Sequence, residues 1–167
     1  MEILSLSCTS AAFGSLSEEL LHLGKSLRFQ ARGASMQPLV RSGDILLVKP
    51  VDPHRVRIGD VVLCSQGQDR ILVHRVICKR STTDGHRFLV QGDQSSQADG
   101  WLAQHQVLGR LVAVERDGKC FKLDGLRMRS LSCFAVLRSR WHLGQNKYSN
   151  FFVRIAKKLP IFSTLFN

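Results

Sequence analysis

Four polar residues in the first hundred positions are of the types that together perform nucleophilic acyl transfer. Ser35 lies in a short segment bounded by Gly33 and Pro38, His74 lies in an apolar run, and Asp93 and Asp99 follow. A serine hydroxyl becomes a useful nucleophile only when a neighbouring base takes its proton. A neutral imidazole is available near pH 7, and a carboxylate behind it fixes the tautomer and stabilises the imidazolium. The residue types therefore predict a Ser–His–Asp site in which either aspartate orients the histidine.

Each of these residues also has a purely structural interpretation. Ser35 could begin a turn before Pro38, and His74 could be a packed strand residue. Asp93 and Asp99 stand beside glycines, where carboxylates commonly accept hydrogen bonds from nearby backbone amides. The order of the surrounding motifs favours the chemical interpretation.

Five elements follow the Ser35 segment in a fixed order. They are Gly59-Asp60-Val61-Val62, Ile71-Leu72-Val73-His74-Arg75-Val76-Ile77, Phe88-Leu89-Val90-Gln91-Gly92-Asp93, Asp99-Gly100 and Gly109-Arg110-Leu111-Val112. Together with Ser35-Met36-Gln37-Pro38 and Ser42-Gly43-Asp44, this set resembles the signal peptidase I family, which is related to LexA-like autoproteases. The resemblance is to the branch of archaeal, endoplasmic-reticulum and spore-former enzymes that use a histidine where most bacterial members use a lysine. It covers residues 29–114, about half the chain.

The resemblance implies that Ser35 is the nucleophile, that His74 is the general base and that Asp99 is its acidic partner. Asp93 matches a second acidic position, where it supports the loop or substitutes for Asp99. The family also implies peptide substrates bound as extended strands, with small side chains just before the scissile bond. Lys79 is a poor substitute base, because a residue five positions after His74 points to the other face of a regular strand.

The oxyanion that develops during acyl transfer needs hydrogen-bond donors. The backbone amide of Ser35 is the first candidate. Many lysine-type relatives place a hydroxyl two residues before the nucleophile, where this chain has Gly33. We therefore expect an oxyanion hole made of backbone amides.

No metal or cofactor is expected. The remaining histidines are scattered along the chain without ligand spacing; they are His22, His54, His86, His105 and His142. The glycines at 33, 43 and 59 fall in turns and form no phosphate-binding loop. Five cysteines without a CxxC pair argue against a disulfide framework, and Cys64 and Cys78 are expected to be buried free thiols.

The fold class expected is mainly β, a coiled and barrel-like sheet of the signal-peptidase type. Short β-prone runs are separated by Gly, Pro, Asp and Ser; these runs are residues 45–48, 61–64, 71–73, 87–90 and 108–114. A helix is predicted from Ser17 to about Gly24. We expect an N-terminal helical segment at 1–27, a catalytic domain at 28–124 and a basic, helical C-terminal extension at 125–167.

The C-terminal extension contains eight Lys or Arg residues and no Asp or Glu, in a chain of net charge +11. Apolar residues alternate with cations at 150–159, which predicts either a segment lying on an anionic membrane or a helix packed on the catalytic domain. Residues 1–27 contain no apolar run of about 20 residues, the length needed to span a bilayer. A cytoplasmic or peripherally membrane-associated protein without a transmembrane helix is therefore expected.

The sequence thus predicts a serine endopeptidase acting on a leader-like peptide or protein. The alternative is a catalytically inactive peptidase-fold module that binds peptides or a membrane partner. Self-cleavage is a third interpretation, but no Ala-Gly-like site precedes Ser35, and Ala11-Ala12 is a poor approximation. Nucleic-acid binding is not expected because no recognised motif accompanies the cations. The sequence does not indicate an oligomeric state.

Overall fold

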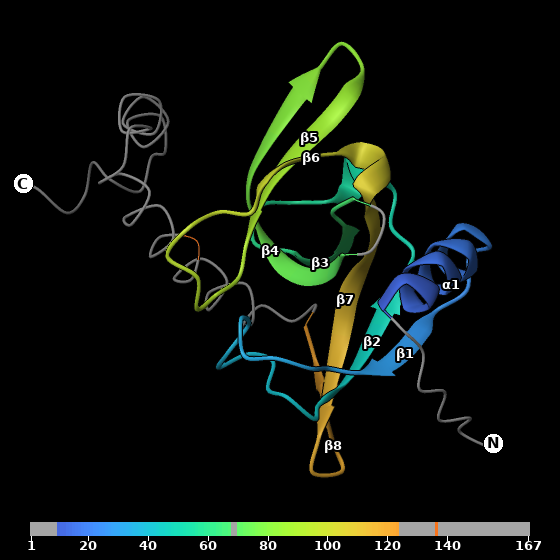
Figure 1. The fold of residues 1–167 in the computed structure, drawn as a ribbon, viewed down its shortest axis with the longest axis vertical. Helices are drawn as coiled ribbons and strands as arrows, with labels where there is room; N and C mark the ends of the chain where they lie inside the picture. Colours follow the sequence, from blue (N-terminus) through green and yellow to red (C-terminus); the bar gives the residue numbers. More distant parts are fainter. Residues whose placement is uncertain (1–9, 68–69, 124–135, 137–167) are drawn as a thin grey trace, which may run out of the picture.

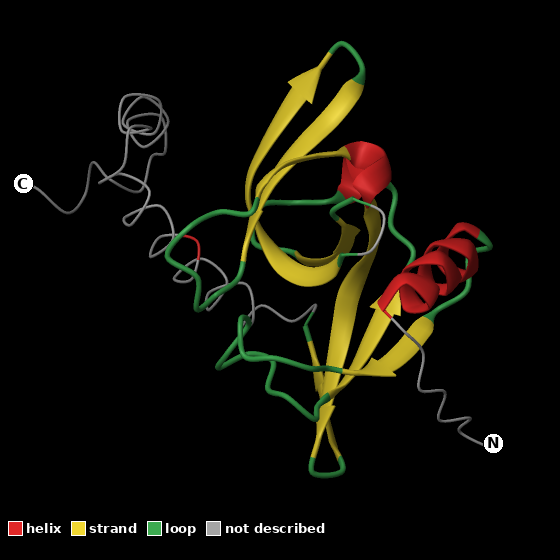
Figure 2. Ribbon diagram, in the orientation of Figure 1, coloured by secondary structure: helices red, strands yellow, loops and turns green. Residues whose placement is uncertain are grey.

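The computed structural model describes residues 10–67, 70–123 and 136. Within them the chain is mainly β, with eight antiparallel strands in one sheet and one short α-helix beside it (Figures 1 and 2). The predicted amphipathic stretch at 150–159, and the rest of the basic extension apart from residue 136, lie outside the described residues. So do His142, Cys8 and Cys133.

Residues 83–84 and 117–118 form two-residue turns between strands, the other connections are longer, and two of these contain a 3₁₀ turn. The elements in chain order are α1 (Ser10–His22), β1 (Leu27–Gln30), β2 (Ile45–Lys49), η1 (Pro53–Arg55), β3 (Val61–Ser65), β4 (Ile71–Thr82), β5 (Gly85–Gln91), β6 (Gly100–Ala103), η2 (Gln104–Gln106), β7 (Val107–Arg116) and β8 (Lys119–Lys122). Their order in the sheet is β1-β2-β7-β3-β4-β5-β6, and β8 pairs with β7.

The sheet is open, which corrects the barrel-like part of the expectation. Strands β1 and β6 stand at its two ends, and in the described part of the chain no hydrogen-bonded ladder joins them. The central strand β7 is long enough to pair with β2 along one side and with β3 and then β8 along the other. The mainly β prediction is confirmed, whereas closure of the sheet is not.

Five of the strands contain the β-prone runs identified in the sequence. Strand β4 is much longer than its predicted run, because it continues for 12 residues through a polar segment to Thr82. The remaining three strands, β1, β6 and β8, have four residues each and were not predicted. All four residues of β8 are exposed, so no apolar pattern marks this strand.

The helix α1 begins at Ser10, seven residues before the predicted start at Ser17. Ser17 resembles an N-cap in sequence, but it is fully buried in the middle of the helix, and its hydroxyl donates to the carbonyl of Phe13 at 2.6 Å. This back-bond to the fourth preceding residue satisfies a serine inside a helix without ending the helix. The Phe13 ring, on the part of the helix that was not predicted, packs edge-on against Phe29 of β1, with centroids 5.0 Å apart.

The core lies on both sides of β3. Val61 and Leu63 belong to one buried apolar cluster, and Val62 and Cys64 belong to another. Because successive strand residues face opposite sides, a strand buried on both faces appears in sequence as an uninterrupted apolar run. His74 on β4 faces the side of Val62, its register partner.

Candidate active site

Ser35 lies on the loop between β1 and β2, which is tied at its base. The Ala31 amide donates to the Asp44 carbonyl at 2.7 Å, and the Gly43 amide donates to the Ala31 carbonyl at 2.9 Å. Inside the loop, the side chain of Met36 is buried in the core. Ser35 is exposed beside this buried anchor, so its hydroxyl is accessible while its backbone is held.

Asp44 is the second anchor of this loop. Its carboxylate accepts hydrogen bonds from the Arg41 amide and from Nε and Nη2 of Arg116 on β7, at 2.6 to 2.8 Å. The hydrogen bonds from the Arg116 guanidinium hold the pKa of this carboxyl below its usual range. The ion pair thus attaches the serine loop to the centre of the sheet.

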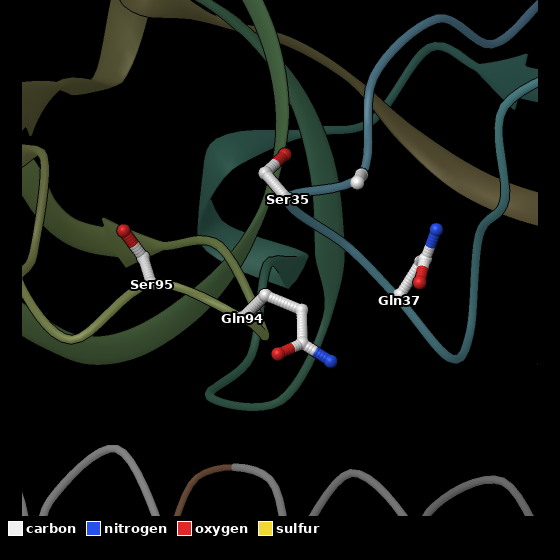
Figure 3. A pocket seen from close by; sticks show the side chains of 5 residues that line it. Ser35, Gln37, Gln94 and Ser95 are labelled. Atoms are coloured by element: carbon white, nitrogen blue, oxygen red, sulfur yellow. The ribbon is translucent and has the colours of Figure 1, made fainter.

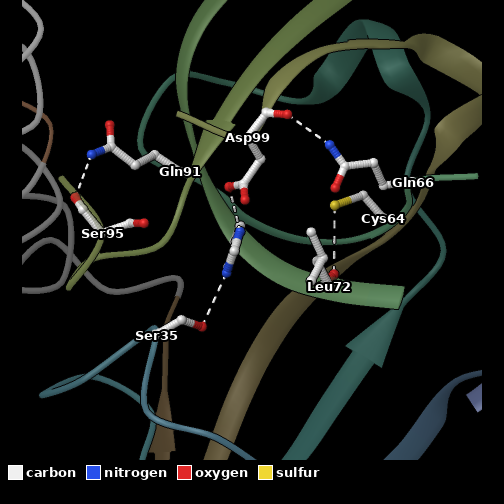
Figure 4. Close-up of polar contacts among 8 residues, drawn as sticks. Ser35, Cys64, Gln66, Leu72, Gln91, Ser95 and Asp99 are labelled. Atoms are coloured by element: carbon white, nitrogen blue, oxygen red, sulfur yellow. Dashed lines mark hydrogen bonds and ion pairs between the residues drawn. The ribbon is translucent and has the colours of Figure 1, made fainter. Parts of the chain in front are cut away.

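His74 stands between Ser35 and Asp99. Its Nε2 lies 3.0 Å from Oγ of Ser35, and its Nδ1 lies 2.7 Å from Oδ2 of Asp99. Figure 4 draws this chain, with the unlabelled imidazole between the two labelled side chains. The histidine is 5% exposed and Asp99 is half-buried, so Ser35 is the solvent-accessible member of the three hydrogen-bonded residues.

The two partners of the imidazole select one neutral tautomer when Asp99 is ionised. An ionised Asp99 accepts from Nδ1–H, which leaves the Nε2 lone pair directed at the Ser35 hydroxyl. A base, a nucleophile and an orienting carboxylate within hydrogen-bond reach are the arrangement that activates a serine. Of the two aspartates left open by the residue types, Asp99 is the one placed against His74.

Asp93 is placed elsewhere. Its carboxylate forms a two-point, buried ion pair with Arg75, in which both N–O distances are 2.7 Å. Nη1 of Arg75 also donates to the Gly59 carbonyl at 2.8 Å. Because Arg75 follows His74 and Asp93 follows Gly92, the pair joins the two chain segments that meet at the site.

The backbone of Gly92 packs closely against the site. A Cβ atom at this position would stand 2.9 Å from the Ser35 carbonyl oxygen, 3.1 Å from Nε2 of His74 and 3.1 Å from Cβ of Ser35. The neighbouring Gln94 amide donates to the Ser35 carbonyl at 2.8 Å. Residues 92–94 therefore pack against the serine and the histidine, and only a glycine fits at residue 92.

An open cavity of about 490 Å³ adjoins the serine (Figure 3). Its lining residues are Ala34, Ser35, Gln37, Gln94 and Ser95. Among the described residues, no hydrogen-bond acceptor engages the backbone N–H of Ser35, so this donor is available to a ligand. Gly33 has a φ of +94° and open space where a side chain would be, in agreement with its expected turn.

Lys79 does not reach the site, although the expected reason was wrong. A bulge between Val76 and Cys78 shifts the register of β4, so Lys79 returns to the face of Val76 and lies over the ring of Phe88. Its ammonium donates to three carbonyls of residues 53–56 at 2.9 to 3.2 Å. Burial lowers the pKa of the Lys79 ammonium, but its three N–H groups are bonded to these carbonyls and not to the serine.

Two of the histidines expected to be scattered are in contact. Nε2 of His86 lies 2.9 Å from Nδ1 of His54. In the part of the chain that the structure describes, no three His, Cys, Asp or Glu side chains are grouped to hold a metal ion. Cys64 and Cys78 are buried free thiols, as predicted. Burial, with a smaller contribution from the charge of Asp99, raises the pKa of the Cys64 thiol to about 12.

Two residues at the site were not identified from the sequence. Arg75 follows His74 directly, but nothing in the sequence indicates that it pairs with Asp93. Gln66 donates from Nε2 to the backbone carbonyl of Asp99 at 2.6 Å, across 33 positions. It lies in a turn-like segment without a motif, so only the three-dimensional arrangement reveals this contact.

Comparisons of the chain with protein-family models, with curated proteins and with solved structures gave no match. Among the described residues, no helix combines the length and apolar character needed to cross a bilayer. A functional assignment therefore depends on the geometry around Ser35 and on the motif resemblance.

Proposed function

We propose that this chain is a serine endopeptidase of the signal-peptidase type, with Ser35 as nucleophile, His74 as general base and Asp99 as the carboxylate that orients the imidazole. One observation carries the proposal. A buried histidine is hydrogen-bonded on one side to an exposed serine at an open cavity and on the other to a carboxylate. The sequence motifs support it independently.

In the acylation step, Oγ of Ser35 attacks the scissile carbonyl carbon while Nε2 of His74 takes the hydroxyl proton. Asp99, bonded to Nδ1–H, stabilises the imidazolium that forms and does not itself take the proton. The tetrahedral intermediate then collapses. The C–N bond breaks, the departing amine takes the proton from Nε2, and an ester between Ser35 and the substrate's acyl part remains.

In the deacylation step, a water molecule takes the place of the amine. His74 removes a proton from the water, the resulting hydroxide attacks the ester, and the proton returns to Oγ of Ser35 as the acid product leaves. The negative charge that develops on the carbonyl oxygen in both steps needs donors fixed in advance. The Ser35 amide has no acceptor among the described residues and is the donor that we propose.

The substrate proposed is an extended peptide, and the resemblance to signal peptidases favours a leader-like sequence with small side chains before the scissile bond. The open cavity beside Ser35 suits an extended chain because it lies at the surface. We also propose that the basic C-terminal segment brings the enzyme to anionic membranes, since each surface cation contributes about 1 kcal/mol of attraction.

The test is cleavage of a peptide library by the wild-type protein and by Ser35→Ala, with and without anionic vesicles, followed by mass spectrometry. Ser42→Ala is the matched control, because this serine is also exposed in the β1–β2 loop but has no bond to His74. We expect Ser35→Ala to reduce cleavage by at least about 1,000-fold and Ser42→Ala to leave it unchanged.

His74→Ala is expected to be nearly as damaging as Ser35→Ala, because an unassisted hydroxyl is a weak nucleophile. A His74→Ala protein with full activity would rule out the proposed base. If wild type and Ser35→Ala are equally inert with and without vesicles, the chain is instead the non-catalytic, peptide-binding module.

A further inference from the structure

The position of Asp99 depends on more than its own loop. The residue ends the connection between β5 and β6, whose turns hold few buried side chains. On one side, the backbone N–H of Asp99 donates to the Val90 carbonyl at 3.0 Å. On the other side, its carbonyl accepts from Nε2 of Gln66 at 2.6 Å (Figure 4). The backbone N–H and C=O of Asp99 are thus both hydrogen-bonded, while its carboxylate bonds to His74.

Gln66 reaches this carbonyl from the same unit that carries the histidine. Val62 is the register partner of His74, and Cys64 is the partner of Leu72. Because strand residues alternate between faces, Gln66, just beyond the end of β3, continues the face of Val62 and Cys64. Its backbone N–H closes the β3–β4 connection by donating to the Arg70 carbonyl at 2.8 Å.

Two side chains of the β3–β4 hairpin therefore bond to Asp99 at two different groups. The imidazole on β4 holds the carboxylate, and the carboxamide at the end of β3 holds the backbone carbonyl. A residue held at its backbone carbonyl and at its carboxylate loses the freedom to turn that carboxylate away from Nδ1. This is the support that a reacting constellation needs to stay within about 0.5 Å of its productive geometry.

The Oε1 atom of the Gln66 carboxamide lowers the stability of the fold. This atom is buried and has no hydrogen-bond partner among the described residues. Leaving a buried acceptor unsatisfied is unfavourable, whereas an apolar side chain of similar shape would avoid the penalty. Within the described part of the chain, the contact to Asp99 is the one compensating bond that the carboxamide makes, which favours a role in positioning over one in stability.

We infer that Gln66 is a positioning residue for the Ser–His–Asp site, acting through the backbone of Asp99. The inference rests on the proposed peptidase function for its kinetic consequence, but its structural consequence, a hydrogen bond between Asp99 and His74 that depends on Gln66, stands without it. Gln66 lies outside the lining of the cavity beside Ser35. Its removal is expected to lower kcat and to leave KM unchanged.

The experiment uses the full chain with ¹⁵N-labelled histidine and observes the Nδ1–H proton of His74 by NMR. In wild type, we expect a downfield resonance that is protected from solvent exchange and disappears in Asp99→Asn. Gln66→Met keeps the length of the side chain and removes the donor. We expect this variant to lose or broaden the resonance and to lower kcat about 10- to 100-fold.

Gln106→Met is the matched control. Gln106 is also a half-buried glutamine whose Nε2 donates to a backbone carbonyl, that of Ser65, at 3.2 Å. Its Oε1 also accepts from the Ala103 amide at 2.8 Å. Its loss therefore disturbs the end of β3 and the end of β6 without removing a hydrogen bond to Asp99, so the resonance and kcat should both persist. Gln66→Leu is the second variant should Gln66→Met unfold, because it also removes the donor and brings no buried polar atom of its own.

The outcomes separate the inference from the proposed function. An unchanged resonance and kcat in a folded Gln66→Met protein overturn the positioning role and leave the peptidase proposal intact. A resonance that depends on Gln66, in a wild-type protein without Ser35-dependent cleavage, supports the positioning role and overturns the peptidase proposal. A wild-type spectrum without an Asp99-dependent resonance overturns the inference directly.

Discussion

Arg75 and Asp93 form an ion pair in which the guanidinium meets both carboxylate oxygens at 2.7 Å, and both side chains are buried. The pair lies one residue after His74 on β4 and one residue after Gly92 at the end of β5. Asp99, six positions later, meets the imidazole instead. Two aspartates that are equivalent by residue type are therefore expected to fail in different ways when they are replaced.

Asp93→Ala is expected to lower the free energy of unfolding, and Asp99→Asn is expected to abolish most of the activity. Removing one partner of a buried ion pair leaves an uncompensated charge and costs about 3–5 kcal/mol of stability. Losing the orienting carboxylate lowers kcat by about 10²- to 10⁴-fold with little change in stability. Urea denaturation and peptidase kinetics on both variants make the comparison. The reverse pattern, a stable Asp93→Ala and an active Asp99→Asn, would contradict the assignment.

Gly92→Ala is expected to inactivate the protein by steric displacement. The new Cβ would stand 2.9 Å from a backbone oxygen, which cannot rotate away, and 3.1 Å from Nε2 of His74. Overpacking costs about 1–3 kcal/mol, and a displacement of about 1 Å at the reacting groups lowers kcat/KM about 100-fold. Kinetics and thermal melting of the variant measure the two effects.

Gly14→Ala is the control for this substitution. A Cβ at residue 14 of α1 would meet only the flexible side chain of Ile71, at 3.2 Å, and alanine is the better helix former. Activity should persist in Gly14→Ala. Equal activity of the two variants would show that Gly92 is replaceable and that the site has room the structure does not show.

The fold was predictable where burial leaves a sequence pattern. Strand β3 is buried on both faces and appears as an apolar run, whereas β8 is exposed along its whole length and has no pattern. The start of α1 was misplaced because Ser17 has the residue type of a cap but bonds backward inside the helix. The parity argument for Lys79 failed because a bulge in β4 has no local sequence signal.

The site was predictable in part for the same reason. The residue types pointed to Ser35 and His74 but left Asp93 and Asp99 equivalent, and only the family resemblance favoured Asp99. The structure places Asp99 and Ser35 on opposite sides of His74. The contacts of Arg75 and Gln66 depend on which strands pair and in which register. Those contacts join positions 18 and 33 residues apart through polar groups that are ordinary surface types in sequence.

The pair of Asp44 and Arg116 predicts a loss of stability in acid. The pKa of Asp44 is lowered in the folded protein, so the unfolded state binds more protons at low pH. The stability contributed by the ionised Asp44 carboxylate is fully present above the unfolded-state pKa of about 3.9. It is lost as the pH falls through the lower pKa of the folded protein. We expect Asp44→Asn to cost about 2 kcal/mol at pH 7 and progressively less below pH 4.

Denaturant unfolding of wild type and Asp44→Asn between pH 7 and pH 2 measures this difference. Glu115→Gln is the control, because the Glu115–Arg28 pair also involves the end of β7 but is solvent-exposed, and exposed pairs contribute little. A difference between wild type and Asp44→Asn that stays constant down to pH 2 would show that the carboxylate contributes through packing and not through its charge.

The thiol of Cys64 is expected to resist alkylation in the folded protein. Burial raises its pKa to about 12, so almost none of the reactive thiolate exists at pH 8, whereas Cys120 on β8 is exposed. A short pulse of iodoacetamide followed by peptide mapping should modify Cys120 at least about 100-fold faster than Cys64, because only the thiolate reacts. The difference should vanish in urea. Equal rates in the native protein would mean that β3 and β4 separate readily, and the hairpin that holds His74 against Asp99 would then be too mobile to support the proposed site.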